Sequence, residues 1–295
     1  MPQTVPRAAL RTPLGERLGE RLAAMSVPCP MHPSVHRIEA AVIDWARGTG
    51  LDTDPAAGVH LLAGRAFARY DTGVATLFAR WLTWLSRLRG EPSAFEGVLA
   101  IAGGGEPGPA PLERAFADLW RACAPAMSDG WRERFTAGLV AQRAALPGAR
   151  VSSGEDRPAP GGAGFGRHLF DLVEPCVGVE VPARIQESPQ WRSAAEASGD
   201  VVAWCDDLAA GGGRGTAVSA PPDGGEAAAE WVADRVVARM EELWNAARAL
   251  PLLVERCDLG FAASRDVIRV ACAFLTIPRA YLEGLLESPR YRHLE

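Results

Sequence analysis

Two adjacent carboxylates, Asp206 and Asp207, lie just after Trp204 and Cys205 in a mostly apolar stretch. Carboxylate oxygens are the ligands that hard divalent ions such as Mg²⁺ prefer, so the pair is a candidate metal site. If this stretch is helical, only one of two consecutive side chains faces inward, and the pair then offers one metal ligand and one supporting group. The alternative is an exposed helix end before the glycine run at 211–213, so the pair alone is a weak metal site.

Aromatic side chains gather in two neighbouring segments, with Phe67 in the first and Phe78, Trp81 and Trp84 in the second. A cavity lined by such rings, together with Trp204, would bind a hydrocarbon and would stabilise a cation through the ring faces. The alternative is that these residues form an ordinary hydrophobic core.

Positive charge comes from arginine alone, because the 295-residue chain has 31 basic residues and no lysine. Against 36 acidic residues this gives a net charge of −5, which argues against a general nucleic-acid binder. The absence of lysine also excludes the phosphate-binding GxxxxGK[ST] loop. The simplest explanation for most of the arginines is GC-rich codon usage, which makes arginine abundant. The six cysteines stand singly without a CxxC pair, which indicates reduced thiols and a cytoplasmic protein.

The elements that must position these groups are helices, because apolar residues recur at helical spacing along most of the chain. Period-2 strand patterns bounded by turns are hard to find, so the predicted class is all-α. The last helix contains Pro278, which lacks the N–H of the helical ladder and is predicted to kink or break it. Helical spacing is found in residues 34–47, 59–70, 78–88, 112–123, 131–139, 201–208, 232–243 and 267–285.

Glycine and proline clusters at 103–111, 151–164 and 211–225 are predicted to be loops rather than domain linkers, because the flanking apolar stripes are too short for independent cores. Residues 1–30 are expected to form an N-terminal arm, with disorder left open, and residues 31–295 a single domain. No apolar run reaches the length of a membrane span, and the first residues do not resemble a signal peptide.

Four segments in order resemble the bacterial class I terpene synthases. Residues 29–51 (CPMHP, DWAR, GL) resemble the family's opening "P…HP" and "eWa…fgL". Residues 80–84 (RWLTW) resemble its "dWxxW" helix, 201–208 (VVAWCDDL) its "ivxWxNDl" helix, and 288–291 (SPRY) its terminal "xRY". The resemblance implies an all-α, single-domain helical bundle with a central apolar cavity. It also implies three Mg²⁺ ions that bind a diphosphate and pull it off as a leaving group.

Both metal motifs of that family are altered in this chain. The first motif, DDxxD, should begin eight residues after the first tryptophan of its helix, where this chain has Arg89. The second, NDxxSxxxE, maps onto Asp206, Asp207, Ala210 and Arg214. A guanidinium repels a divalent ion instead of ligating it, so the resemblance predicts no trinuclear cluster, and Mg²⁺ is a doubtful cofactor held at most by the two aspartates.

The remaining site residues are assigned by the same resemblance. Arg167 or Arg150 takes the place of the arginine that senses the diphosphate, and Arg290 and Tyr291 close over it. Asp171 lies one residue away from the position of the aspartate that follows the sensor. Together with the two arginines at the metal-motif positions, these arginines are expected to hold an anion at the cavity mouth without metal. Exposed arginines without such a role are the alternative.

Three functions remain open from the sequence. The first is a terpene cyclase-type enzyme, a lyase or isomerase, that ionises or reshapes a prenyl diphosphate with a reduced metal site. The second is a metal-independent cyclase or isomerase of a non-diphosphate terpenoid, with Asp206 or Asp171 as the proton donor. The third is a non-catalytic descendant that binds a hydrophobic ligand or partner. The expected partner is a small molecule, without nucleic acid or a membrane span, and a homodimer is left open.

Overall fold

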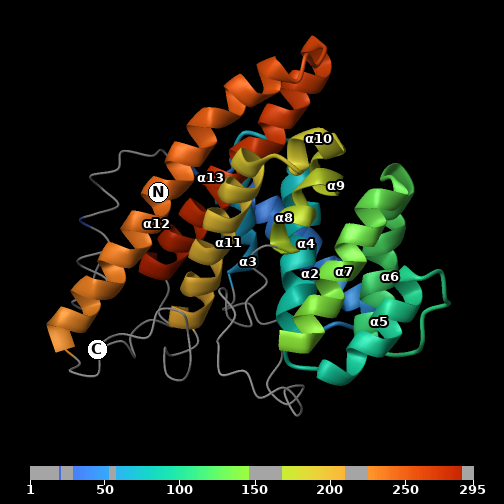
Figure 1. Ribbon diagram of the computed structural model, residues 1–295. Helices are drawn as coiled ribbons and strands as arrows, with labels where there is room; N and C mark the ends of the chain where they lie inside the picture. Colours follow the sequence, from blue (N-terminus) through green and yellow to red (C-terminus); the bar gives the residue numbers. More distant parts are fainter. Residues whose placement is uncertain (1–19, 21–28, 53–57, 146–167, 210–224, 288–295) are drawn as a thin grey trace, which may run out of the picture.

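The helices expected from apolar spacing are present in the computed structural model, which describes residues 20, 29–52, 58–145, 168–209 and 225–287 (Figure 1). The described residues form helices and turns without a strand, so the all-α class is confirmed. The α-helices are α2 Val35–Thr49, α3 Val59–Ala66, α4 Thr72–Leu88, α5 Phe95–Ala102, α6 Pro111–Cys123, α7 Asp129–Ala145, α8 His168–Asp171, α9 Val173–Val177, α10 Ala183–Gln186, α11 Pro189–Ala209, α12 Gly225–Arg256 and α13 Phe261–Glu287.

Local sequence explains where several helices begin and end. Gly50 closes α2 in the left-handed conformation, with φ of 74°, which glycine adopts at little cost. Ser128 caps α7, because its Oγ accepts the backbone N–H of Trp131 at 3.2 Å. Ser34 occupies the N-cap of α2 without a side-chain cap bond, and its own N–H donates instead to Nδ1 of the buried His32 at 3.0 Å.

Helix α4 runs through the centre of the bundle. Helices α2, α3, α6 and α9 pack against it, while α11, α12 and α13 pack against one another. Helix α13 also contacts α3 and α9, so these two helices join the α4 side of the bundle to the α11–α13 side (Figure 1). The core is therefore continuous from α4 to α13. None of the described helices is long and apolar enough to cross a bilayer.

An aromatic layer lies between α4, α6 and α7. Its rings contact one another at centroid separations such as 5.0 Å for Trp84–Phe116 and 5.2 Å for Trp131–Phe135, within the range of favourable ring pairs. The members of the layer are Trp81, Trp84, Phe116, Trp120, Trp131 and Phe135.

Helix α13 continues through Pro278, so of the predicted kink or break, the break is wrong. Proline cannot donate an N–H to the carbonyl four residues earlier, which here belongs to Phe274. The hydroxyl of Ser198, on the neighbouring helix α11, donates to this carbonyl at 2.8 Å and replaces the missing donor. Ser198 is fully buried, so a side chain distant in sequence satisfies the helical ladder at Pro278.

Candidate active site

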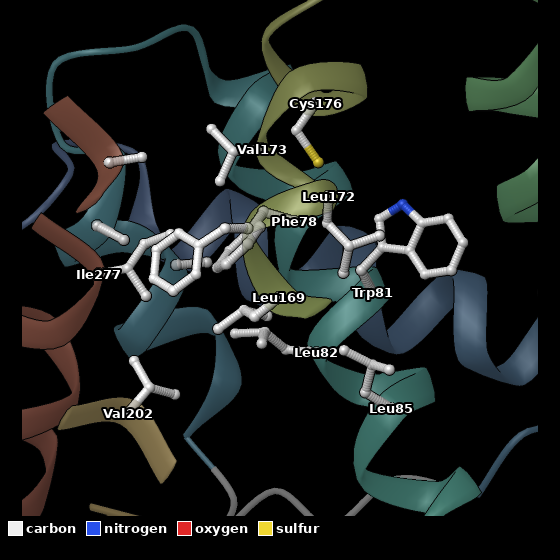
Figure 2. Packing of buried hydrophobic residues seen from close by; sticks show 14 of the residues in the cluster. Phe78, Trp81, Leu82, Leu85, Leu169, Leu172, Val173, Cys176, Val202 and Ile277 are labelled. Atoms are coloured by element: carbon white, nitrogen blue, oxygen red, sulfur yellow. The ribbon is translucent and has the colours of Figure 1, made fainter. Parts of the chain in front are cut away.

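An apolar interior lies where α4, α8, α9, α11 and α13 meet (Figure 2). Side chains from all five helices, and from Leu172 at the turn between α8 and α9, converge on this region, and all of them are buried. A region enclosed in this way excludes water. The labelled side chains are Phe78, Trp81, Leu82, Leu85, Leu169, Leu172, Val173, Cys176, Val202 and Ile277.

Helices α4 and α11 both reach the same end of the bundle with their carboxyl ends (Figure 1). Arg89 continues α4, since its N–H donates to the Leu85 carbonyl at 3.3 Å and its φ and ψ of −60° and −34° are helical. It follows Leu85 by four residues and Leu82 by seven, so helical spacing places it on the stripe that faces the interior in Figure 2. Arg89 is half-buried, and its Nε is shielded from solvent.

On the opposite wall, α11 remains helical through Ala209 and therefore includes positions 206 and 207. Position 206 follows Val202 by four residues, and Val202 points into the interior in Figure 2. The side chains of Asp206 and Asp207 lie outside the described residues, and so do Arg167, Arg214, Arg290 and Tyr291. The structure thus places two of the predicted segments, the ends of α4 and α11, at the same end of the bundle, and the roles of the other residues named here stay predictions.

The donor set does not fit the three-ion Mg²⁺ cluster that the resemblance implies. The α4 wall presents a guanidinium at Arg89 where that cluster needs a carboxylate, and like charges repel. Within the described part of the chain, no group of three or more histidine, cysteine, aspartate or glutamate residues is placed to hold a metal ion. The predicted acid pair on α11 remains a candidate for a single ion.

The aromatic residues predicted to line a cavity take different places. Phe67 and Phe78 pack together with ring centroids 4.8 Å apart. Trp84 turns toward α6, where its Nε1 donates to the Leu112 carbonyl at 3.0 Å. Trp81 contacts both the interior and the aromatic layer. Of the aromatic residues predicted to line a cavity, Phe78 therefore fits that role best, because it lies among the interior side chains of the other helices in Figure 2.

Trp204 lies in the seam between α11 and α12. The guanidinium carbon of Arg235 is 5.7 Å from the Trp204 ring and 5.2 Å from the Trp231 ring, which is cation–π distance for both. Nearby, Arg239 donates to the Asp200 carboxylate at 2.9 Å. These contacts fasten the carboxyl-terminal half of α11, where positions 206 and 207 occur, to α12.

Asp171 ends α8 beside a buried histidine. Its carboxylate is 3.3 Å from Nδ1 of His168, and the ring of His168 packs on Phe135 of α7 with centroids 4.6 Å apart. Gly138 permits this close approach, because a Cβ there would clash with the His168 ring. The Asp171 carbonyl accepts the Trp131 indole N–H at 2.9 Å. The predicted proton donor Asp171 is thus held close to α7.

Glu174, on α9, is a buried acid that the sequence patterns did not single out. Its Oε1 accepts the backbone N–H of Val181 at 2.6 Å and the amide of Gln186 at 2.9 Å, and its Oε2 accepts from Arg134 at 2.9 Å. Burial raises the pKa of the Glu174 carboxyl to about 7, although the Val181 N–H and Arg134 oppose the rise. The sequence feature that could have identified Glu174 is its place as an acid inside the apolar run 172–177.

Comparison with known proteins gives relatives of one kind. No protein-family profile matches the chain. Pristinol synthase from Streptomyces pristinaespiralis is 27% identical over 224 residues, which are 64% of this chain and 60% of that protein. The (+)-T-muurolol synthase of Roseiflexus castenholzii, described as cyclizing (2E,6E)-farnesyl diphosphate, is 26% identical over 60% of this chain and 63% of its own length. The alignments thus span less than two thirds of either relative.

Solved structures extend the likeness over most of the chain. Germacradien-4-ol synthase from Streptomyces citricolor superposes with a TM-score of 0.74 at 20% identity, covering 88% of this chain and 96% of that one. Linalool/nerolidol synthase from Streptomyces clavuligerus, solved with 2-fluorogeranyl diphosphate, gives a TM-score of 0.69 at 19% identity, over 90% and 98%. The sequence is thus similar to those of bacterial terpene synthases, and the fold is the all-α fold of the class I terpene synthases.

Proposed function

We propose that this protein is a terpene cyclase-type enzyme that handles a prenyl diphosphate, or a terpenoid derived from one, with an atypical, metal-poor site. The observation that carries the proposal is the apolar interior of Figure 2, to which α4, α8, α9, α11 and α13 contribute side chains in a terpene synthase fold. The relatives support it, since the names of two of them specify prenyl diphosphates.

The interior supplies a setting for carbocation chemistry. Leu82, Leu172 and Ile277 are each at most 5% exposed, so they exclude water that would quench a cation too early. The fully buried Phe78 offers a ring face that stabilises positive charge in the hydrocarbon. These residues would hold the hydrocarbon chain of the substrate in a folded shape and so set the course of the reaction. The diphosphate of the substrate would stay near Arg89.

The charge inversion at Arg89 favours a second candidate, the rearrangement or cyclisation of a neutral terpenoid by protonation. In that reaction an acid protonates the substrate and later recovers the proton from the product cation. Asp206 and Asp171 are the candidate donors. A non-catalytic ligand-binding descendant is the third candidate.

Product analysis separates these functions. Purified protein is incubated with geranyl, farnesyl or geranylgeranyl diphosphate, with and without Mg²⁺, and organic extracts are analysed by mass spectrometry. Hydrocarbon or alcohol products support the diphosphate reaction. Turnover of a neutral terpenoid alone, abolished in Asp206→Asn, supports the second candidate. Ligand-induced stabilisation without any product supports the third, because binding to the folded state raises apparent stability by mass action.

A further inference from the structure

Helix α9 is a wall of the apolar interior that cannot hold its own position. It is five residues long, whereas isolated helices shorter than about 12 residues are marginal in water. Val173 and Cys176 of this helix lie among the interior side chains (Figure 2). The position of α9, and with it the shape of this wall, therefore depends on the contacts that α9 makes with its neighbours.

Glu174 joins α9 to α7 and to the segment that leads into α10. Its backbone carbonyl accepts the N–H of Val179 at 3.0 Å. Its Oε1 accepts the N–H of Val181 at 2.6 Å and the side-chain amide of Gln186 at 2.9 Å. Its Oε2 accepts from Arg134 of α7 at 2.9 Å. One buried residue thus fastens α9 to two other helices.

The surroundings of the Glu174 carboxyl group leave its negative charge only partly offset. Burial raises its pKa to about 7. Arg134 opposes this rise, but its side chain is 35% exposed, so water screens its charge. The carboxylate of Asp171 on α8, which lies 3.3 Å from His168, adds to the rise. Gln186 of α10 is neutral, and the labelled side chains of α4 and α13 in Figure 2 carry no charge.

We propose that Glu174 positions α9 as a wall of the interior and that ionisation of its carboxyl group loosens this wall. The closed position of α9 buries the carboxyl group, whereas local opening exposes it to water, where the ionised form is favoured. Opening should therefore become more frequent as pH rises from about 4.5 to about 7. The inference rests on the proposed function, because α9 matters for the reaction only if the interior holds the substrate.

Hydrogen–deuterium exchange, followed by mass spectrometry of peptides that cover α9, measures this opening once the intrinsic effect of pH on exchange is corrected. We expect the opening equilibrium of the wild-type protein to rise about tenfold or more from pH 5 to pH 8, because the closed form binds more protons. Glu174→Gln removes the ionisable group and should show no such rise. Glu187→Gln, at an exposed position directly after α10, is the matched control and should keep the wild-type response.

The competing explanation is that the three donors hold the ionised carboxylate as firmly as the neutral group. Wild-type exchange in α9 that does not change with pH would establish it and overturn the inference, and so would an equal pH response in Glu174→Gln and Glu187→Gln. If Glu174→Gln fails to fold, Arg134→Gln replaces it. Without the positive charge, α9 should open about threefold more often than in the wild type at pH 8 and equally often at pH 5. Equal exchange at both pH values would contradict the inference.

Farnesol, which has a hydrocarbon chain but no phosphate, separates this inference from the proposed function. Slower exchange of α9 with farnesol supports α9 as a wall of the ligand site, because the ligand stabilises the closed position. Farnesol that binds and leaves the exchange of α9 unchanged shows that α9 is not such a wall. Farnesol that does not bind contradicts the proposed function, while the pH response of α9 and its loss in Glu174→Gln still decide the role of Glu174.

Discussion

Glu174 shows how one buried ionisable group makes stability depend on pH. Its carboxyl has a pKa of about 7 in the folded protein and an ordinary value of 4.5 when unfolded. The folded state therefore binds more protons between these values, and stability falls as pH rises from about 4.5 to about 7. Arg134, Gln186 and the Val181 N–H limit this loss by holding the ionised form.

We expect Glu174→Gln to reduce the pH dependence of unfolding. Glutamine does not ionise, so the decline in stability from pH 5 to pH 8 should shrink by about 2–3 kcal/mol relative to wild type, from the size of the pKa shift. Urea unfolding at both pH values measures it. Exposed Glu187, changed to glutamine, is the control and should leave the wild-type pH dependence in place. An unchanged slope in Glu174→Gln would contradict this account.

Phe78 is the residue with which to test the apolar interior. Replacing it with leucine keeps an apolar side chain and leaves space, so we expect a loss of about 1–3 kcal/mol in unfolding free energy. If the interior holds substrate, the same change should alter the product mixture or the preferred chain length. Phe95 on α5, also buried but absent from the labelled interior group, is the control: Phe95→Leu should lower stability and leave the products unchanged.

At the scale of elements, α11 and α13 depend on each other at Pro278. The Phe274 carbonyl is buried against Ser198 and has lost its usual helical partner. Removing the hydroxyl in Ser198→Ala leaves this carbonyl without a donor, which should cost about 1–3 kcal/mol. Ser193→Ala, at an exposed position of the same helix, should cost much less.

A second substitution tests that explanation directly. Pro278→Ala restores a backbone N–H four residues after Phe274, so in the Ser198→Ala background it should recover part of the lost stability. A double-mutant cycle by urea unfolding measures the coupling. Additive effects of the two substitutions would show that the hydroxyl and the proline are not linked.

The elements also show which features the sequence predicts. Amphipathic helices such as α2, α4 and α6 were predictable because their buried residues recur at helical spacing. Helix α5 was not, because its eight residues are apolar on nearly every side and show no single stripe. The continuity of α13 depends on a donor 76 residues away in the chain, which no local pattern reveals.

The candidate site was likewise predictable only in part. The positions of Arg89 and of the acid pair follow from motif spacing, and the structure places their helix ends at one end of the bundle. The burial of Glu174 was not predictable, because Arg134, Val181 and Gln186 come from three other segments. Local sequence thus assigns candidate chemistry to residues, whereas their surroundings come from tertiary packing.

At the scale of the molecule, the interior ties distant helices into one cooperative unit. Its side chains come from α4, α9, α11 and α13, and the core cluster includes residues from both sides of the bundle. We therefore propose that residues 31–295 unfold as one domain. Urea transitions followed by far-UV circular dichroism and by tryptophan fluorescence should have the same midpoint. Two separate midpoints would indicate that the α4 and α11–α13 sides unfold independently.

The aromatic layer also gives the protein an optical signature. The rings of Trp81 and Trp84 are 5.6 Å apart, and those of Trp120 and Trp131 are 5.7 Å apart, in fixed and different orientations. Electronic transitions of indoles held this closely mix, so the layer should give an excitonic band in the circular dichroism spectrum. These indoles belong to α4, α6 and α7. The band would therefore show, without any added label, whether the packing of these three helices stays ordered when a ligand binds to the neighbouring interior.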